Sequence, residues 1–179
     1  LQAREKSLCL HEWQRMNHAK AASHAAKFSE ELRIHLKRFA DADEFSVGNL
    51  GDLLASADEL ARWGDHEEAL ARYYRGTEYL AKIRLKDAGE NVVEIGWKEA
   101  WENLERLGDP LALAFKTEHG LRRRLQIRNL TIYGHGSEPV DAAQTRAIAG
   151  SLRNLLREHL PAALVCWSTE RRPCSLRET

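Results

Sequence analysis

The strongest constraint on the fold is a two-residue break, Gly64-Asp65, that separates two runs of helical periodicity. Before the break, apolar residues recur at the spacing of one helix face, at Leu53, Leu54, Ala57, Leu60 and Ala61. After the break, the same spacing continues at Ala69, Leu70, Tyr73, Tyr74, Tyr79, Leu80 and Ile83. Asp65 is a residue type that caps helix starts, and a connection this short holds two helices side by side and antiparallel. The sequence therefore predicts a helical hairpin over residues 50–85.

The rest of the chain also has helical spacing, and no segment shows the alternation typical of a β-strand. Glycines, prolines and capping residues delimit further helices, which we expect at 97–107, 111–117, 118–133 and 141–159. Between them, residues 87–96 form a loop whose Val92, Val93 and Ile95 are expected to touch the core. The predicted fold class is all-α, a helical bundle with a long N-terminal helical segment.

Three parts are expected along the chain. Residues 4–40 contain no Gly or Pro and predict one long helix or two helices, with the thin apolar stripe of a connector. We therefore assign 1–45 to an N-terminal helical connector, 46–165 to the bundle and 166–179 to a frayed tail beyond Pro161. The hairpin resembles one tetratricopeptide unit, but a solenoid needs about three repeats and the sequence has no second copy.

Charge and cysteine usage argue against several classes of function. The 179 residues include 27 Lys or Arg and 27 Asp or Glu, so the chain does not bind nucleic acid through bulk charge. The three cysteines, Cys9, Cys166 and Cys174, form no CxxC pair, which disfavours a disulfide framework or a zinc cluster. No apolar run approaches the ~20 residues of a membrane span. We expect a cytoplasmic chain without membrane contact, metal or other cofactor.

Candidate chemistry is concentrated in residues 128–135, where Arg128 and His135 are seven residues apart. Seven residues are almost two helical turns, so both side chains project from one face, with Cα atoms roughly 10 Å apart. RNA carries its own nucleophile, the 2′-hydroxyl, and its cleavage needs one group that handles the proton and another that stabilises charge on phosphorus. A histidine suits the first task and a permanently protonated arginine suits the second, and neither task requires a metal.

Neighbouring side chains extend this candidate site. Asn129 can position the arginine or a phosphate, and Thr131 lies on nearly the same face of the expected helix. One to two turns upstream, three consecutive arginines are candidate contacts to neighbouring phosphates of RNA, although such a run is more often a solvated helix face. They are Arg122, Arg123 and Arg124.

Other polar residues receive weaker assignments. Arg75 and Glu78 are candidate supporting residues, because their helix is expected near the motif helix, and a structural ion-pair row is the alternative. Trp97 and Trp101, four residues apart, are expected in the core. The histidines of the N-terminal segment lack the spacing of metal ligands and are predicted to be solvated. They are His11, His18, His24 and His35. Three further histidines near helix ends, His66, His119 and His159, are predicted to lie on the surface.

Two segments resemble the CRISPR-associated HEPN proteins. Residues 128–140, RNLTIYGHGSEPV, resemble the segment RN-x-S-x-x-x-HG-x-x-PV of that family and contain the R-x(4–6)-H motif of HEPN domains. Residues 66–78, HEEALARYYRGTE, resemble the family segment YDDAVARLYRALE. The similarity spans about Leu50 to Leu160. The motif and the upstream hairpin together are more specific than the motif alone.

The resemblance implies a HEPN-like bundle that forms a homodimer, in which two motifs meet at the two-fold axis and build one cleft that cleaves single-stranded RNA. It also implies an ancillary ribonuclease of type III CRISPR antiviral defence. In such proteins an N-terminal Rossmann-like sensor domain binds cyclic oligoadenylate and activates the cleft. This sequence has no βαβ pattern or Gly-rich phosphate loop, so we expect that sensor to be absent from the chain, with residues 1–40 as helices leading back to it.

The chain departs from the family segment at two places. His66 replaces a tyrosine, and Gly76-Thr77 replaces Ala-Leu, which puts a glycine inside a helix at a cost of about 1 kcal/mol. Two other functions stay open. One is a non-catalytic helical module, HEPN-like or tetratricopeptide-like, that binds protein or RNA. The other is the toxin half of a HEPN toxin–antitoxin pair, regulated by a protein partner.

Overall fold

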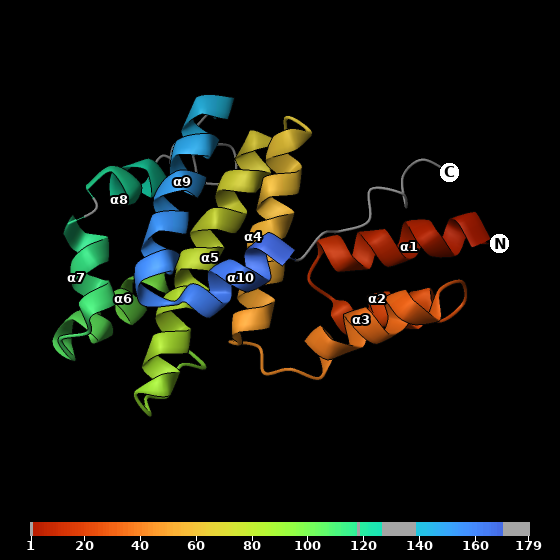
Figure 1. The fold of residues 1–179 in the computed structure, drawn as a ribbon, viewed down its shortest axis with the longest axis horizontal. Coiled ribbons are helices and arrows are strands. Elements are labelled where there is room, and N and C mark those ends of the chain that lie inside the picture. The colour runs from red at the N-terminus through yellow and green to blue at the C-terminus, as the bar shows by residue number, and fades with distance from the viewer. Residues whose placement is uncertain (1, 118, 127–138, 170–179) are drawn as a thin grey trace.

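The computed structural model describes residues 2–117, 119–126 and 139–169, and within these ranges it contains ten α-helices and no strand, which confirms the all-α class. Figure 1 shows α1 to α3 grouped beside a bundle that α4 to α10 form. The helices are α1 (Gln2–Gln14), α2 (His18–Ala25), α3 (Glu30–Ala40), α4 (Val47–Arg62), α5 (His66–Asp87), α6 (Trp97–Arg106), α7 (Pro110–Thr117), α8 (His119–Gln126), α9 (Ala142–His159) and α10 (Pro161–Thr169). No helix in the described ranges has both the length and the apolar character needed to cross a bilayer.

The predicted hairpin is the centre of the bundle. Helices α4 and α5 pack along each other, and Gly64 in the turn between them has φ +85°, a conformation that favours glycine. As predicted, Asp65 caps α5, because its carboxylate accepts a hydrogen bond from the Glu68 amide. Helix α4 is buried along most of its length, since α5 covers one of its faces and α10 another.

Two glycines allow the helices around α4 to approach closely. A Cβ added to Gly51 would lie 2.5 Å from Cys166 Cβ and 3.0 Å from the Trp167 amide nitrogen, on α10. A Cβ added to Gly76 would lie 2.6 Å from Leu54 Cδ2, where α5 meets α4. The glycine that weakens α5 as an isolated helix therefore stands at its contact with α4.

The C-terminal helices close the bundle. Helix α9 begins at the predicted place, with a capping box in which Asp141 and Gln144 satisfy each other's backbone amides. Pro161 begins α10, which packs on α4 and buries Trp167. Helix α10 continues to Thr169, so ordered structure extends beyond the bundle boundary that we predicted at residue 165. The rest of the predicted tail, 170–179, lies outside the described residues.

Helix α6 covers another face of α5, and α7 packs on α6, α8 and α9. Trp101 is buried and stacks on Phe115 with ring centroids 3.9 Å apart, which confirms its place in the core. Trp97 is half-buried, and its indole Nε1 donates to the Thr77 hydroxyl at 2.8 Å. In the preceding loop, Val92 is buried as expected. The prediction for Val93 was wrong, since its side chain points to solvent and is 75% exposed.

The N-terminal segment is a three-helix unit, which corrects the prediction of one or two helices. Its turns contain neither Gly nor Pro. Met16 adopts φ +59° to end α1, and the side chains of Asn17 and Ser29 cap α2 and α3 by accepting hydrogen bonds from backbone amides. The three helices enclose a small core of their own. Its buried members are Cys9, Trp13, Ala21, Ala22, Ala25 and Leu36. The thin apolar stripe of this segment is therefore enough to form the core of a short three-helix unit.

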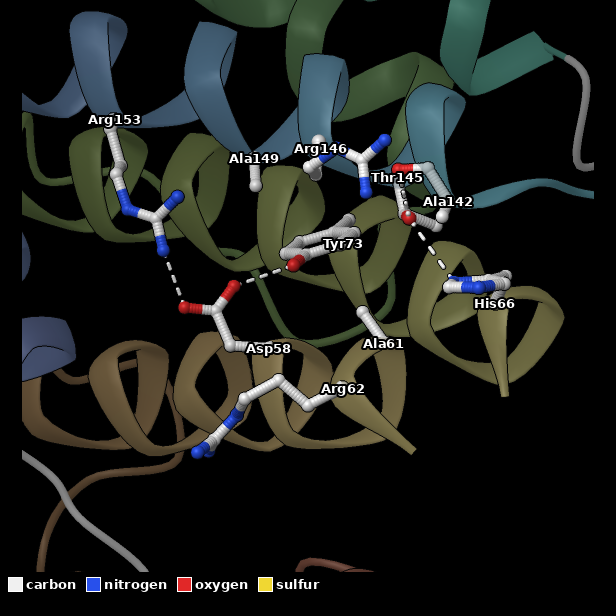
Figure 2. Close-up of a pocket in the computed structure, with 10 residues that line it drawn as sticks. All are labelled: Asp58, Ala61, Arg62, His66, Tyr73, Ala142, Thr145, Arg146, Ala149 and Arg153. Atoms are coloured by element: carbon white, nitrogen blue, oxygen red, sulfur yellow. Dashed lines mark hydrogen bonds and ion pairs between the residues drawn. The ribbon is translucent and has the colours of Figure 1, made fainter. Parts of the chain in front are cut away.

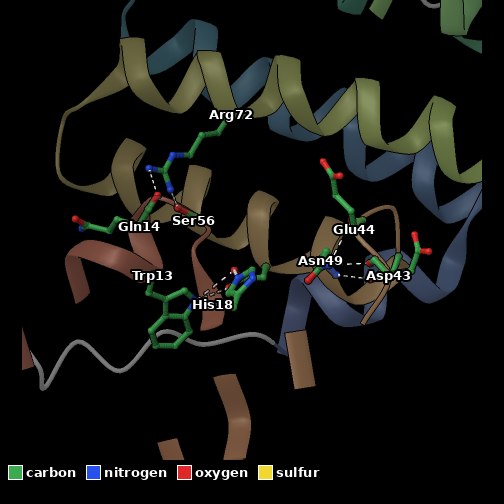
Figure 3. A network of polar contacts seen from close by, with 10 residues as sticks. Trp13, Gln14, His18, Asp43, Glu44, Asn49, Ser56 and Arg72 are labelled. Carbon is green, nitrogen blue, oxygen red and sulfur yellow. Dashed lines mark hydrogen bonds and ion pairs between the residues drawn. The ribbon is translucent and has the colours of Figure 1, made fainter. Parts of the chain in front are cut away.

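A polar junction joins this unit to the hairpin (Figure 3). The fully buried Asp52 accepts hydrogen bonds from Trp13 Nε1 at 3.1 Å and pairs with His18 Nε2 at 2.9 Å. From α5, Arg72 donates to the Gln14 carbonyl at 2.6 Å and also to the Ser56 hydroxyl. The prediction that His18 is solvated was wrong, because its side chain is only 6% exposed. The Asp52 carboxylate, on α4, holds the His18 imidazole in place.

Candidate functional site

The residues of the predicted catalytic motif, Arg128, Asn129, Thr131 and His135, lie outside the described residues. The structure does describe both flanks of the segment that carries them. Helix α8 leads into the segment and ends at Gln126, and the chain is described again from Pro139. Val140 is buried and α9 follows at once, so both flanks belong to the bundle.

The three consecutive arginines lie on α8, which is anchored by Leu121 and Leu125. These two leucines are fully buried, one turn apart on the face toward the bundle. Arg122 and Arg123 are exposed. Arg124 is half-buried, and its guanidinium folds back along the helix to within 2.9 Å of where a Cβ on Gly120 would lie. Two of the three guanidiniums are therefore free to meet a ligand from solvent.

Arg75 and Glu78 belong to an ion-pair row on α5. The Glu78 carboxylate pairs with Arg75 Nη1 at 2.6 Å and with Lys82 Nζ at 3.0 Å. Arg75 also lies 3.9 Å from the carboxylate of Glu44, in the connection before α4, and its guanidinium covers the Tyr79 ring. These contacts fit the structural alternative that the sequence left open. A supporting role at the predicted catalytic motif stays a prediction.

A groove between α4, α5 and α9 has a volume of about 710 Å³ (Figure 2). Alanines on the facing helices, among them Ala61 and Ala149, leave the space open. We call it the α4–α9 groove. Its lining residues are Asp58, Ala61, Arg62, His66, Tyr73, Ala142, Thr145, Arg146, Ala149 and Arg153.

Asp58 is fully engaged within the groove. One carboxylate oxygen accepts the Tyr73 hydroxyl at 2.6 Å, and the other accepts Arg153 and the Trp167 indole Nε1, the latter at 3.0 Å. Burial, reinforced by the adjacent Asp58 carboxylate, raises the pKa of Tyr73, so this phenol stays protonated and donates. The guanidinium of Arg153 also lies over the Trp167 ring, 4.3 Å from its centroid. The carboxylate, the phenol and Arg153 are therefore committed to holding α4, α5, α9 and α10 together.

The other cations of the groove have no such partner. Arg62 ends α4 and Arg146 lies in the second turn of α9. Both are exposed, and neither pairs with a carboxylate within the described part of the chain. At the start of α5, His66 Nδ1 lies 3.2 Å from the Thr145 hydroxyl, so the imidazole is half-buried at the mouth of the groove. The groove is lined by three arginines and by one carboxylate that already accepts hydrogen bonds, so its net positive charge suits an anion.

Sequence reasoning did not single out Arg62 or Arg146. One signal was present for Arg146, whose helical neighbours at three and four residues in both directions are Ala142, Ala143, Ala149 and Gly150. An arginine without a carboxylate at those positions has no ion-pair partner on its own helix. For Arg62 no local signal existed, because the groove forms only when α9 packs across the hairpin.

Other kinds of site are not supported within the described ranges. No group of three or more His, Cys, Asp or Glu side chains there is arranged to hold a metal ion. Comparisons with protein-family models, curated proteins and solved structures found no match.

Proposed function

We propose that the chain is a metal-independent endoribonuclease domain of the HEPN type that cleaves single-stranded RNA. The observation that carries the proposal is the segment from Arg128 to His135, read together with the upstream hairpin that it accompanies in the CRISPR-associated HEPN proteins. The all-α bundle and the position of α4 and α5 at its centre are consistent with this assignment. In the proposed setting the chain is the effector part of an antiviral defence protein, activated through a cyclic-oligoadenylate sensor domain.

Each residue of the proposed site has a defined task. His135 orients or deprotonates the 2′-hydroxyl, which then attacks the adjacent phosphorus. Arg128 stabilises the charge that develops on the phosphoryl oxygens, and Asn129 positions the arginine or the phosphate. The leaving group is the 5′-oxygen of the next nucleotide, so the products carry a 2′,3′-cyclic phosphate and a 5′-hydroxyl. Two copies of the chain supply two such sets to one cleft in the proposed homodimer.

Cleavage of a labelled single-stranded RNA in the presence of EDTA tests this function. We expect the wild-type chain to cut, and His135→Ala and Arg128→Ala each to abolish cutting. Arg106→Ala, an exposed arginine at the end of α6, serves as a matched control and should retain full activity. Product ends are identified by mass. Cutting that stops in EDTA, or that persists in both variants, would rule out the proposed chemistry.

The alternative is a non-catalytic module that binds RNA or a protein, and the α4–α9 groove is the observation that favours it. The groove offers unpartnered cations without an evident nucleophile. Under this alternative the wild-type chain binds RNA in the same assay and leaves it intact. A toxin of a toxin–antitoxin pair would instead cut RNA until a partner protein is added.

A further inference from the structure

The α4–α9 groove presents two arginines from different helices to the same space. Arg62 comes from the last turn of α4 and Arg146 from α9, and Figure 2 shows both among the side chains that line the groove. Some other arginines of the described chain face a carboxylate, as Arg33 faces Glu30 and Arg84 faces Asp109. Arg62 and Arg146 instead face a groove whose one lining carboxylate is already bound by three donors.

The engaged carboxylate matters for the electrostatics of the groove. Asp58 would repel an anion if it were free, but Arg153 neutralises it, and Tyr73 and Trp167 also donate hydrogen bonds to it. The charge of Arg62 and Arg146 therefore remains uncompensated. Guanidinium groups donate two parallel hydrogen bonds to phosphate or carboxylate oxygens, so a phosphate is one of the anions that they bind with good geometry.

The position of the groove indicates that the phosphate belongs to RNA. His66 and Ala142 are among its lining residues, and Ala142 follows the segment 127–138 after only three residues. The groove therefore begins only a few residues along the chain from the segment that carries the proposed catalytic motif. The volume of about 710 Å³ and the alanine-lined walls leave room for a strand rather than for a single ion.

We propose that the α4–α9 groove binds the backbone of single-stranded RNA, with Arg62 and Arg146 each contacting one phosphate. The identity of the ligand rests on the proposed function, whereas the anion preference rests on the groove itself. Binding of this kind depends on phosphates and not on base edges, so it is independent of sequence. It holds the strand beside the motif and does not take part in bond cleavage.

Fluorescence anisotropy with a labelled 2′-O-methyl RNA tests the groove separately from catalysis, because this RNA lacks the nucleophile and cannot be cut. The variant is Arg62→Gln with Arg146→Gln in the full chain. Each phosphate contact to a single strand contributes a slope of about 0.7 in log Kd against log salt, so two lost contacts raise Kd by about 25-fold at 0.1 M salt and lower the slope by about 1.4. The difference should vanish toward 1 M salt.

Arg106→Gln, which removes an exposed arginine on α6, is the matched control and should bind like the wild-type chain. Thermal melting of each variant confirms that the fold is intact. An unchanged Kd and slope in the double variant, or no RNA binding by the wild-type chain, would overturn the groove assignment. Weaker RNA binding by the double variant, in a chain that does not cut RNA, would support the groove and favour the non-catalytic module.

Discussion

The close contact at Gly51 leads to a quantitative prediction for Gly51→Ala. The added methyl group would lie 2.5 Å from Cys166 Cβ, 2.9 Å from the Cys166 carbonyl carbon and 3.0 Å from the Trp167 amide nitrogen. Two of these three atoms belong to the backbone of α10, so no rotamer change relieves the overlap and α10 must move away from α4. Overpacking of this kind costs about 3 kcal/mol at the upper end of the usual range.

Helix propensity acts in the opposite direction. Alanine in place of glycine inside a helix stabilises the folded state by about 1 kcal/mol. The net loss in free energy of unfolding for Gly51→Ala is therefore about 2 kcal/mol. For a chain of this size, about 2–4 °C in melting temperature corresponds to each kcal/mol, so the variant should melt about 4–8 °C lower.

Gly150→Ala is the matched control. Gly150 lies inside α9, and a Cβ added there meets nothing within 4 Å, so only the propensity gain applies. It should raise the melting temperature by about 2–4 °C. Gly76→Ala falls between the two, because its new methyl group meets the movable tip of Leu54.

Calorimetry or circular dichroism melts of the three variants provide the measurement. A Gly51→Ala chain that melts at or above the wild-type temperature would refute the close packing of α10 on α4. A double-mutant cycle sharpens the test, because Cys166→Gly removes the nearest atom. The cycle should give a coupling of at least about 0.5 kcal/mol that partly restores Gly51→Ala, as expected for residues in direct contact.

Two further predictions concern the N-terminal unit. Asp52→Ala leaves Trp13 Nε1 and His18 without their buried acceptor, so urea unfolding should show a free energy of unfolding about 3 kcal/mol lower than that of the wild type. Asp41→Ala, at an exposed carboxylate, should change it little. A loss below about 1 kcal/mol for Asp52→Ala would mean that the junction does not depend on this carboxylate. Burial raises the pKa of the Cys9 thiol to about 11, so at pH 8 roughly one thiol in a thousand is ionised. Peptide mapping after treatment with a thiol reagent should show Cys166 modified well before Cys9, and equal rates would contradict the burial of Cys9.

Local signals made the hairpin and α9 predictable. Gly64, Asp65 and Asp141 mark helix ends through backbone conformation and capping, which depend on only a few neighbouring residues. The N-terminal unit escaped prediction because its turns use Met16 at positive φ and single capping side chains, Asn17 and Ser29, in a segment with neither Gly nor Pro. Capping by one Asn or Ser is a weak signal when helix-forming residues lie on both sides.

Contacts between residues far apart in sequence explain why the groove could not be predicted from the sequence. Trp167 looked like part of a tail, yet it is buried because α10 crosses α4, and His18 looked solvated until Asp52 met it. In the same way, Arg62 and Arg146 line one groove only because α9 packs on the hairpin. The proposed catalytic pair, Arg128 and His135, was identified from its spacing and its resemblance to a family, and both residues lie outside the described ranges.

The packing of α10 on α4 also affects the order in which the helices can fold during translation. The core of α1 to α3 is built from residues 9–36 alone, so this unit can fold soon after it leaves the ribosome. The central helix of the bundle, α4, is completed much later, because the indole of Trp167 that donates to Asp58 is 109 residues further along the chain. Until translation reaches α10, one face of α4 has no protein to cover it and is open to chaperones. The last of the described helices is thus the one that completes the core around α4.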